Sequence, residues 1–414
     1  MKIARLKLTS VLIAAVLMAT FNVAGLTLAA AQTETLMHNF TGSPDGSIPQ
    51  RSGLLFYQSD YYGVTLEGGS SNYGTVYYLF QDSNGAWQEQ LAFNFPGGSG
   101  GNYPIGTLIT DAAGDFYGAT IAGGSANCGV VFKLHDNLGT WEESVLHDFS
   151  GSDGCDPEGP LVFDKTGNLF GTTIIGGAYG EGAIFELSPS GGSWTNTLVH
   201  SFGQAPDGSL PYGGLIFDAA GNLYGTASNG GAYNCTGLGC GVAFQLVPGS
   251  SGWTENIMHN FQGRADGMYP NSPLTIDANG NLYGSTTYGG GLGGSAGSGT
   301  VYELSPASDG TWNETILHRF VGGTVGGAPS SPLTLDRVGN LYGETGQTNS
   351  SQGTIFRLSP KTRGGWAFKV LHTFNGTNGA NPQGGLLFRT GGSLYGTTIY
   401  GGTDNSGVAF LLTP

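Results

Sequence analysis

Short apolar runs separated by polar, glycine-rich turns recur along the chain, and residues 214–261 show the pattern in full. Residues 214–217 and 223–226 are mostly apolar, and the segment between them reads Asp-Ala-Ala-Gly-Asn. A third apolar run follows at 241–246, and residues 253–261 then alternate between apolar and polar side chains. Continuous apolar runs are typical of strands covered on both faces, and alternation is typical of a strand with one solvated face. The pattern predicts four short antiparallel strands, the last of them outermost.

This unit repeats from one end of the chain to the other. Its landmark is a glycine that follows an aromatic residue in the second strand, and successive copies are 53 to 59 residues apart. The copies are Gly63, Gly118, Gly171, Gly225, Gly284, Gly343 and Gly396. A period of this size with four strands per unit predicts an all-β propeller of four-stranded antiparallel blades, because each repeat can form one blade.

The two ends of the chain together make one further blade. Residues 34–40 resemble a fourth strand that stands alone, and residues 385–388, 393–397 and 407–412 resemble strands one to three without a fourth. Pairing of the first strand with the last would close a ring and remove the exposed sheet edges. We therefore expect residues 32–414 to form a single domain with seven blades.

Residues 1–31 have the features of a secretory signal peptide. Lys2, Arg5 and Lys7 precede the apolar run 11–19, and small residues at 29–31 suit cleavage. Removal of these three positive charges changes the formal net charge from −15 to −18. Such a negative chain is expected to bind neither nucleic acid nor anionic lipid surfaces. We expect an extracellular or periplasmic monomer without membrane insertion after cleavage.

The repeat resembles a known family. Its carriers are the recurring "DxxGNLYGTT", present at 164–173 with Phe170 in the tyrosine place, followed by "GxVFxL" and "WxExxLHxF" segments. These motifs are similar to those of the GloVer tandem-repeat proteins of bacterial secretomes, also described as choice-of-anchor proteins. The resemblance covers nearly all of residues 32–414. It implies a propeller fold and export, and it implies no catalytic residues.

The histidines and tryptophans follow the repeat, which favours structural roles for both. Six of the seven histidines occupy one place in the fourth strand, so ring symmetry would keep them apart and no shared metal site is predicted. They are His38, His147, His200, His259, His318 and His372. Each of the six tryptophans opens a fourth strand and is expected to pack there. Matches to G-x-G-x-x-G and G-x-S-x-G at 289–297 lie in a glycine-rich loop without a following helix, so we expect neither motif to function.

The four cysteines are expected to pair in an oxidising compartment. Cys235 and Cys240 lie in one loop between second and third strands, whereas Cys128 lies in such a loop and Cys155 in the following blade-to-blade loop. Both kinds of loop should emerge on the same face of the ring. The predicted disulfides are Cys128 with Cys155 and Cys235 with Cys240.

The same face is expected to gather tyrosines suited to stacking on sugars. The candidate binding residues are Tyr103, Tyr179, Tyr212, Tyr233, Tyr269, Tyr288 and Tyr400, although such tyrosines also pack their own loops. The aspartates before glycine in the blade-to-blade loops are turn residues in the simpler interpretation, with calcium as an alternative. These are Asp45, Asp153, Asp207 and Asp266.

Three functional hypotheses remain open from the sequence. The first is a secreted binding or surface-interaction module for extracellular carbohydrate, without catalytic residues, cofactor or metal. The second is a glycosidase or polysaccharide lyase that uses loop carboxylates, with Asp156, Glu158, Glu181 and Glu344 as candidates. The third is a scaffold that binds another protein. Propeller folds support many activities, so the fold does not choose between them.

Overall fold

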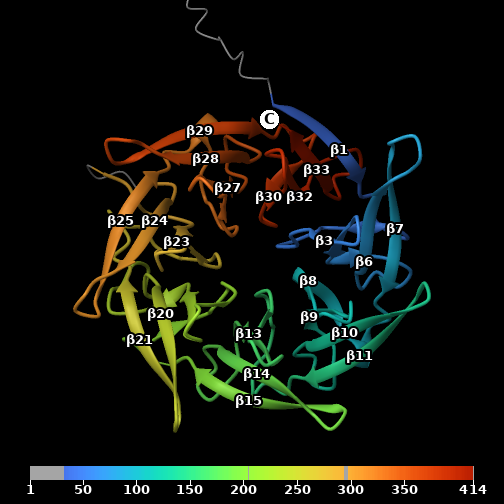
Figure 1. The fold of residues 1–414 in the computed structure, drawn as a ribbon, viewed down its shortest axis with the longest axis horizontal. Coiled ribbons are helices and arrows are strands. Elements are labelled where there is room, and N and C mark those ends of the chain that lie inside the picture. The colour runs from blue at the N-terminus through green and yellow to red at the C-terminus, as the bar shows by residue number, and fades with distance from the viewer. Residues whose placement is uncertain (1–31, 204, 293–296, 414) are drawn as a thin grey trace, which may run out of the picture. The chain divides into compact units, whose positions relative to one another are not determined.

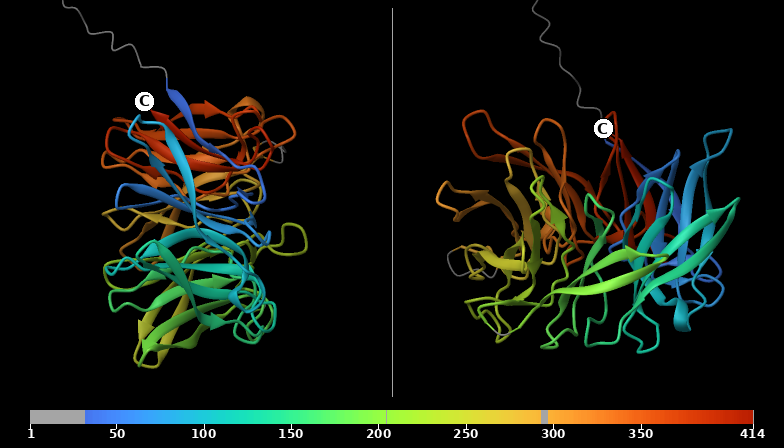
Figure 2. Two further views of the ribbon diagram at one scale, coloured as in Figure 1. Left: turned by 90° about the vertical axis from the view of Figure 1, so that its right-hand side faces the viewer. Right: turned by 60° about the horizontal axis from the view of Figure 1, so that its bottom comes forward.

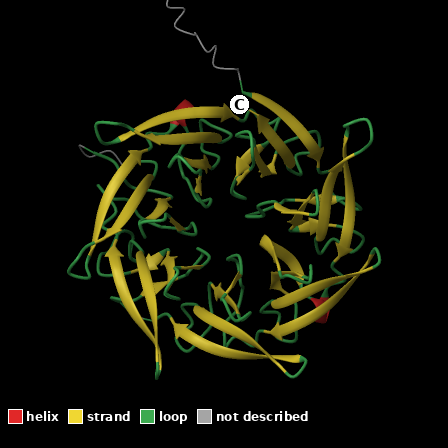
Figure 3. Cartoon of the chain, in the orientation of Figure 1, coloured by secondary structure: helices red, strands yellow, loops and turns green. Residues whose placement is uncertain are grey.

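Each predicted repeat folds as a four-stranded antiparallel sheet. The structure is a computed structural model that describes residues 32–203, 205–292 and 297–413. The described residues contain strands and two short 3-10 turns, η1 (Gly98–Gly100) and η2 (Gly323–Val325), and no α-helix (Figure 3). The sheets follow one another around a central axis, the first strand of each innermost and the fourth at the rim (Figure 1). The sequence prediction of a seven-bladed propeller is confirmed.

The blades are numbered in chain order. Blades 1 to 3 contain β3 (Leu55–Tyr57), β4 (Asp60–Thr65), β6 (Thr75–Gln81) and β7 (Trp87–Asn94), then β8 (Asn102–Thr110), β9 (Phe116–Ala122), β10 (Val130–Asn137) and β11 (Thr140–Asp148), then β12 (Val162–Phe163), β13 (Leu169–Thr173), β14 (Ala183–Ser190) and β15 (Ser193–Ser201). Blades 4 to 6 contain β17 (Ile216–Phe217), β18 (Leu223–Ala227), β20 (Val242–Gly249) and β21 (Gly252–Asn260), then β22 (Thr275–Ile276), β23 (Leu282–Thr286), β24 (Thr300–Pro306) and β25 (Trp312–Arg319), then β26 (Thr334–Leu335), β27 (Leu341–Thr345), β28 (Thr354–Pro360) and β29 (Trp366–Thr373).

Blade 7 is built from both ends of the chain. It contains β31 (Leu387–Phe388), β32 (Leu394–Tyr400) and β33 (Val408–Thr413), and β1 (Thr33–Asn39) supplies its rim strand (Figure 1). The antiparallel register runs from Thr33 opposite Thr413 to Asn39 opposite Val408. A short strand, β30 (Ala380–Pro382), also pairs with β32. This ring closure is the one that the sequence predicted.

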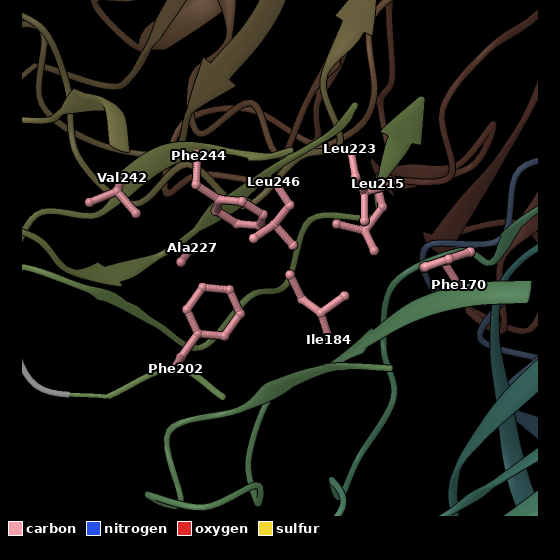
Figure 4. Close-up of a cluster of buried hydrophobic side chains, with 9 residues drawn as sticks. All are labelled: Phe170, Ile184, Phe202, Leu215, Leu223, Ala227, Val242, Phe244 and Leu246. Carbon is pink, nitrogen blue, oxygen red and sulfur yellow. The ribbon is translucent and has the colours of Figure 1, made fainter. Parts of the chain in front are cut away.

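The hydrophobic core lies between neighbouring blades. The second strand β18 is buried at all five positions, whereas the first six residues of the rim strand β21 alternate between exposed and half-buried. Figure 4 shows one such core, in which Phe170, Ile184 and Phe202 of blade 3 lie against Leu223 and Phe244 of blade 4. Packing between blades explains why the first three strands are apolar on both faces.

The recurring second-strand glycine is required by an aromatic ring. A Cβ at Gly118 would lie 2.5 Å from Cζ of Phe132 and 3.0 Å from Leu108 Cδ2, which is too close for real atoms. The third-strand aromatic of the same blade is the obstacle in every repeat, and these residues are Tyr77, Phe132, Phe185, Phe244, Tyr302, Phe356 and Phe410. The glycine therefore repeats because the ring lies directly over the backbone.

The turn between the first two strands is closed by its aspartate. In blade 4, Asp218 Oδ1 accepts from the backbone N–H of Ala220 at 2.8 Å and of Asn222 at 2.9 Å, and Oδ2 accepts from Asn222 Nδ2 at 2.7 Å. Tyr224 also donates its hydroxyl to Asp218 Oδ2 at 3.0 Å. These bonds explain why Asp, Asn and Tyr recur together, since an aspartate that bonds the following backbone defines the turn.

The innermost strands are shorter than the apolar runs predicted. In blade 4 the run 214–217 pairs only as β17, residues Ile216 and Phe217. Segments from all the blades crowd at the axis, and a Cβ on Gly213 would lie 2.9 Å from the carbonyl oxygen of Ser272 in the next loop. The preceding residues therefore contact neighbouring loops instead of extending the sheet.

Both kinds of connecting loop lie on one face of the ring, as the disulfides show. Cys128 bonds Cys155 across two loops and Cys235 bonds Cys240 within one, so both predicted pairs are present. Two small ladders join the same loops, β2 (Gly46–Ser47) with β5 (Glu67–Gly68) and β16 (Gly208–Ser209) with β19 (Asn229–Gly230). Figure 2 shows the blades and their loops from two further sides.

The predicted signal peptide, residues 1–31, lies outside the described residues, as do residues 293–296 of the discounted glycine motifs. No helix among the described residues is long and apolar enough to cross a membrane. The two disulfides indicate an oxidising, non-cytoplasmic compartment, because thiols stay reduced in the cytosol.

Candidate functional site at the central channel

Each blade-to-blade loop contains one residue in the left-handed conformation immediately before a proline. Their φ angles lie between 52° and 63°, and they are Ile48, Tyr103, Asp156, Leu210, Tyr269, Ala328 and Asn381. Each donates its backbone N–H to a carbonyl in a loop of the preceding blade, as Asp156 does to Cys128 O at 2.9 Å. Positive φ is uncommon outside glycine, so seven equivalent copies mark a position that the ring geometry imposes.

The segment after this proline lines the central channel with one polar side chain from each blade. These polar side chains are Arg51, Thr107, Glu158, Tyr212, Asn271, Ser330 and Gln383, and Pro160, Pro273, Pro332 and Gly384 complete the lining. Every one of these segments then reaches a buried leucine, namely Leu54, Leu108, Leu161, Leu215, Leu274, Leu333 or Leu386. Proline and leucine thus repeat around the ring, while the polar side chain that reaches the channel is of a different type in each blade. It directly follows the proline in five blades and lies further along at Arg51 and Thr107. Because the flanks satisfy the fold, the variable polar set is free to serve binding.

The lining side chains nearly fill the channel. The cavity between them measures about 20 Å³, which is room for about one water molecule. A larger ligand cannot enter the channel without moving these side chains. The available surface is therefore its mouth, where the loops meet.

One cation joins three of the lining side chains. Arg51 Nη1 lies 3.5 Å from Glu158 Oε2, and it donates a hydrogen bond to the carbonyl oxygen of Tyr212 at 3.3 Å. The guanidinium carbon lies 4.9 Å from the centre of the Tyr212 ring, a cation–π distance. The three side chains come from blades 1, 3 and 4, so the contact spans the channel.

Two carboxyl groups share the site with Arg51. Burial and the charge of Glu158 together raise the pKa of Asp156 to about 7, against the opposing effect of Arg51. Burial also raises the pKa of Glu158 despite the nearby guanidinium. Among the described residues, Asp156 Oδ1 is buried without a hydrogen-bond partner. Near neutral pH the site therefore offers an acid that can still donate a proton or a hydrogen bond.

The longer disulfide holds this acid in place. Cys155 precedes Asp156, and the N–H of Asp156 donates to the carbonyl of Cys128, the other half of the same bridge. Asp156 also accepts from the N–H of Ile174 at 3.0 Å through its carbonyl. The bridge thus fixes the backbone from which both Asp156 and Glu158 project.

The predicted tyrosines lie in several places and do not form one cluster. Tyr212 lines the channel. Tyr103 and Tyr269 hold left-handed positions and contact loop rings edge-on, Tyr103 with Tyr73 at 6.0 Å and Tyr269 with Tyr288 at 6.1 Å between centroids. The most exposed are Tyr179 at 69%, Tyr288 at 50%, Tyr233 at 47% and Tyr400 at 39%. Tyr400 lines a separate groove with Gln347 and Asn405.

Two of the four candidate carboxylates lie away from the channel. Glu344 is 1% exposed and accepts a hydrogen bond from the N–H of Gly385 at 2.9 Å, so it links blades 6 and 7 internally. Equivalent threonines make the same kind of link, as Thr226 does to the carbonyl of Ser272 at 3.0 Å. Glu181 is exposed, and its carbonyl accepts from Leu210 N–H at 2.9 Å. Only Asp156 and Glu158 meet.

Five of the six tryptophans pack against the second-strand aromatic of the preceding blade, as Trp312 does against Tyr224 at 5.9 Å, and Trp87 contacts Tyr61 of its own blade. The fourth-strand histidines contact the phenylalanine two residues on, and most bond the loop aspartate that the sequence marked as a turn residue. His147 Nε2, for example, lies 2.7 Å from Asp153 Oδ2, and Asp153 Oδ1 accepts from the N–H of Ser150 at 2.9 Å. Both residue types serve the fold at these contacts.

Arg51, Asn271, Ser330 and Gln383 were not identified from the sequence. The signal that could have found them is the varied polar residue between a repeated proline and a repeated leucine. The repeat pattern identifies residues that recur in every blade, and these polar residues differ from blade to blade.

Comparison with known proteins gives a family and a fold. The family model described as the Gloeobacter/Verrucomicrobia repeat matches residues 80–292 and 236–414. No curated protein matches the chain. A solved structure assigned as a 6-phosphogluconolactonase from Bacteroides uniformis is 16% identical, with 87% of this chain and 95% of that chain covered and a TM-score of 0.52. An oxidoreductase assigned as a glucose dehydrogenase from Thermus thermophilus is 16% identical over 75% and 96%, with a TM-score of 0.46. At this identity the likeness shows the fold alone.

Proposed function

The chain belongs to the Gloeobacter/Verrucomicrobia repeat family, and we propose that it is an exported binding module that holds an extracellular glycan at the mouth of its central channel. The observation that carries this proposal is the ring of different polar side chains between repeated prolines and leucines. A fold-only role would accept one residue type in all seven places.

The chemistry of the mouth suits a saccharide. Tyr212 supplies an aromatic ring, and Asn271, Ser330 and Gln383 supply amide and hydroxyl groups for sugar hydroxyls. Arg51 adds donors in a fixed orientation. Export through residues 1–31 and the two disulfides would place this surface outside the cytoplasm, where polysaccharides are available.

A hydrolase is the second candidate, and one observation favours it. Asp156 and Glu158 interact electrostatically at the mouth, and the pKa of Asp156 is raised to about 7 by burial and by Glu158. A carboxyl group that keeps its proton near neutral pH beside a second carboxylate is the arrangement that general acid catalysis of glycoside cleavage uses. In this case Asp156 would donate the proton and Glu158 would act as base or nucleophile.

The test is retention of residues 32–414 on a broad panel of immobilised polysaccharides, with the bound glycan recovered and sized. We expect retention of intact glycan, and a loss of about tenfold or more in affinity on Tyr212→Ala or Arg51→Ala, as for central anchors of an interface. Tyr400→Ala is the matched control, because this tyrosine is exposed and lies outside the channel.

The other outcomes are equally informative. Shortened glycan whose production stops in Asp156→Asn would establish the hydrolase in place of the binding module. No retention on any polysaccharide would reject both carbohydrate functions and leave a protein-binding scaffold. Equal losses for Tyr212→Ala and Tyr400→Ala would place binding outside the channel.

A further inference from the structure

At the rim, side chains from neighbouring blades meet in a set of interface clusters. Each cluster takes a histidine from the fourth strand of one blade, a residue from the loop that follows it, and a residue from the fourth strand of the next blade. In three clusters these residues are histidine, aspartate and glutamate, and their ligand atoms all lie within 4.8 Å of one another. The three sets are His38, Asp45 and Glu89, then His200, Asp207 and Glu255, then His259, Asp266 and Glu314.

The three clusters contain acceptors but too few donors. Oε1 of Glu89, of Glu255 and of Glu314 is buried, and none of the three has a hydrogen-bond partner within the described ranges. The imidazole of each cluster has one proton at most on the nitrogen that faces both carboxylates. An unpaired buried carboxylate oxygen is costly, and a cation held between the histidine and the two carboxylates would satisfy it.

At two other interfaces an asparagine replaces one of the two carboxylates. Between blades 2 and 3, Asn196 replaces the glutamate, and its Nδ2 lies 3.1 Å from His147 Nε2 and 3.2 Å from Asp153 Oδ2. Between blades 6 and 7, Asn378 replaces the aspartate and donates from Nδ2 to Glu34 Oε2 at 2.8 Å. In both places an amide donates to a neighbouring carboxylate, although Glu34 Oε1 is buried without a partner among the described residues. The three clusters with two carboxylates and a histidine lack this donor.

At the remaining two interfaces the combination of histidine and two carboxylates is absent. Between blades 1 and 2, Phe93 replaces the histidine and Glu143 has no aspartate beside it. Between blades 5 and 6, His318 stacks on Phe368 with centroids 3.9 Å apart and ring planes 2° apart. Among the described interfaces, two carboxylates therefore meet at the rim only where a histidine is also present, and this set offers three metal ligands.

The distances also fit a bound metal. His200 Nε2 lies 3.3 Å from Asp207 Oδ2 and 3.6 Å from Glu255 Oε1. His259 Nε2 lies 3.2 Å from Asp266 Oδ2 and 3.7 Å from Glu314 Oε1. Two ligands about 2.0–2.1 Å from one tetrahedral zinc ion are about 3.3–3.4 Å apart. These spacings are close to the ligand edges of such a site. In the third cluster His38 Nε2 lies 3.0 Å from Asp45 Oδ2, an ordinary hydrogen-bond distance.

The aspartates are already oriented as ligands. Asp207 Oδ2 accepts from Gly203 N–H at 2.8 Å, and its Oδ1 accepts from Gly208 N–H at 2.7 Å. Both oxygens of Asp266 accept from Gln262 N–H, at 3.1 and 3.0 Å. Such outer contacts fix the carboxylate toward the histidine before any ion arrives.

We propose that these three rim clusters are divalent metal sites, each holding zinc through one histidine and two carboxylates and joining adjacent blades. Imidazole with carboxylates suits zinc better than calcium, which prefers oxygen ligands only. Water would complete the coordination. The ions would bridge blade 7 to blade 1, blade 3 to blade 4 and blade 4 to blade 5. These sites are separate from the channel and do not depend on the proposed glycan.

The test is metal content of tag-free residues 32–414, stripped with EDTA, reloaded with zinc at pH 7.5 and desalted. We expect three zinc ions per chain and a higher Tm than in the stripped protein. Glu255→Asn, which copies the natural Asn196, should reduce the content to two, and Glu255→Asn with Glu314→Asn should reduce it to one.

Glu34→Gln is the matched control, because its cluster has Asn378 in place of the aspartate and so holds only one carboxylate, and the content should stay at three. Asp207→Asn, which copies Asn378, repeats the test if Glu255→Asn does not fold. Zinc content near zero in the reloaded protein would overturn the proposal and leave a proton in each cluster. Unchanged content in both Glu255→Asn and Asp207→Asn would assign the zinc to other groups and would also overturn it.

Discussion

At the scale of single residues, the same rim position has different partners in different blades. His147 bonds an aspartate and an asparagine, whereas His318 lies against Phe368 with its Nε2 buried and without a partner among the described residues. Burial lowers the pKa of His318 to about 4. His147 is held by hydrogen bonds at its ring nitrogen, and His318 is held by stacking of its ring face on Phe368.

His318→Phe, which copies Phe93 of blade 1, should stabilise the protein at acid pH. In the unfolded chain His318 takes up a proton near pH 6.5, whereas in the folded chain it does so only near pH 4. Wild-type stability therefore falls as the pH decreases from about 6.5 to about 4. The Tm difference between variant and wild type should grow from pH 7 to pH 4.5. Thermal unfolding by circular dichroism at several pH values measures it.

The control for that experiment is His147→Phe. It breaks a bonded cluster and should lower stability by about 1–3 kcal/mol at neutral pH. A Tm difference for His318→Phe that does not vary with pH would contradict the assigned pKa.

Glu344→Thr, which restores the residue type found at Thr226, should stabilise the protein above neutral pH. Burial raises the pKa of Glu344 to about 7, so the folded state keeps a proton that the unfolded state releases near pH 4.5. Wild-type stability therefore declines as pH rises from about 4.5 to about 7, and the variant lacks this decline. Urea titrations at pH 5 and pH 8 test the sign, and a larger gain at pH 5 than at pH 8 would be inconsistent with it.

At the scale of elements, the loops are held by cross-links of different reach. The bridge between Cys128 and Cys155 closes 27 residues of chain, and that between Cys235 and Cys240 closes 5. Chain entropy assigns about 3–4 kcal/mol to the first and about 2 kcal/mol to the second. The first also ends beside Asp156.

Cys128→Ala with Cys155→Ala should therefore lower the free energy of unfolding more than Cys235→Ala with Cys240→Ala. The first pair should also weaken binding at the channel mouth, because the backbone of Asp156 and Glu158 loses its anchor. Denaturant unfolding and glycan retention of the two double variants, compared side by side, check both effects. Equal stability losses would show that loop length does not govern these bridges.

At the scale of the whole molecule, ring closure depends on one strand that is distant in sequence from its partners. β1 pairs with β33, and no covalent hairpin joins them, although Thr33 lies opposite Thr413. In the other blades a direct hairpin joins the third and fourth strands.

Moving residues 32–40 to follow residue 413 through a short turn should preserve the fold. The permuted chain makes blade 7 like the others, and its unfolding should remain a single transition. Deletion of residues 32–40 should instead expose the edge of β33 and cause aggregation or early unfolding. Size-exclusion chromatography with thermal unfolding compares the two, and a stable monomer after the deletion would show that closure is dispensable.

The sequence by itself determined the number of blades, the strand order and the closure, because each repeat carries the same local signals. Asp218 and Asn222 specify a turn, and Gly225 specifies a backbone beneath the ring of Phe244. These requirements involve residues close together in the sequence, so the turns and strands can be predicted from the chain alone. The disulfide pairs followed because the repeat assigned each cysteine to a loop.

Only the tertiary structure decided which side chains meet. Arg51 contacts Glu158 across the channel, although the two residues are far apart in the sequence. His259 and Asp266 come from one strand and its loop, but Glu314 joins them from the next blade. Such contacts depend on how the ring brings neighbouring blades together, which the sequence pattern of a single repeat does not indicate. The repeat predicted correctly that the histidines lie in separate blades. It did not predict that three of them lie beside a carboxylate from the next blade.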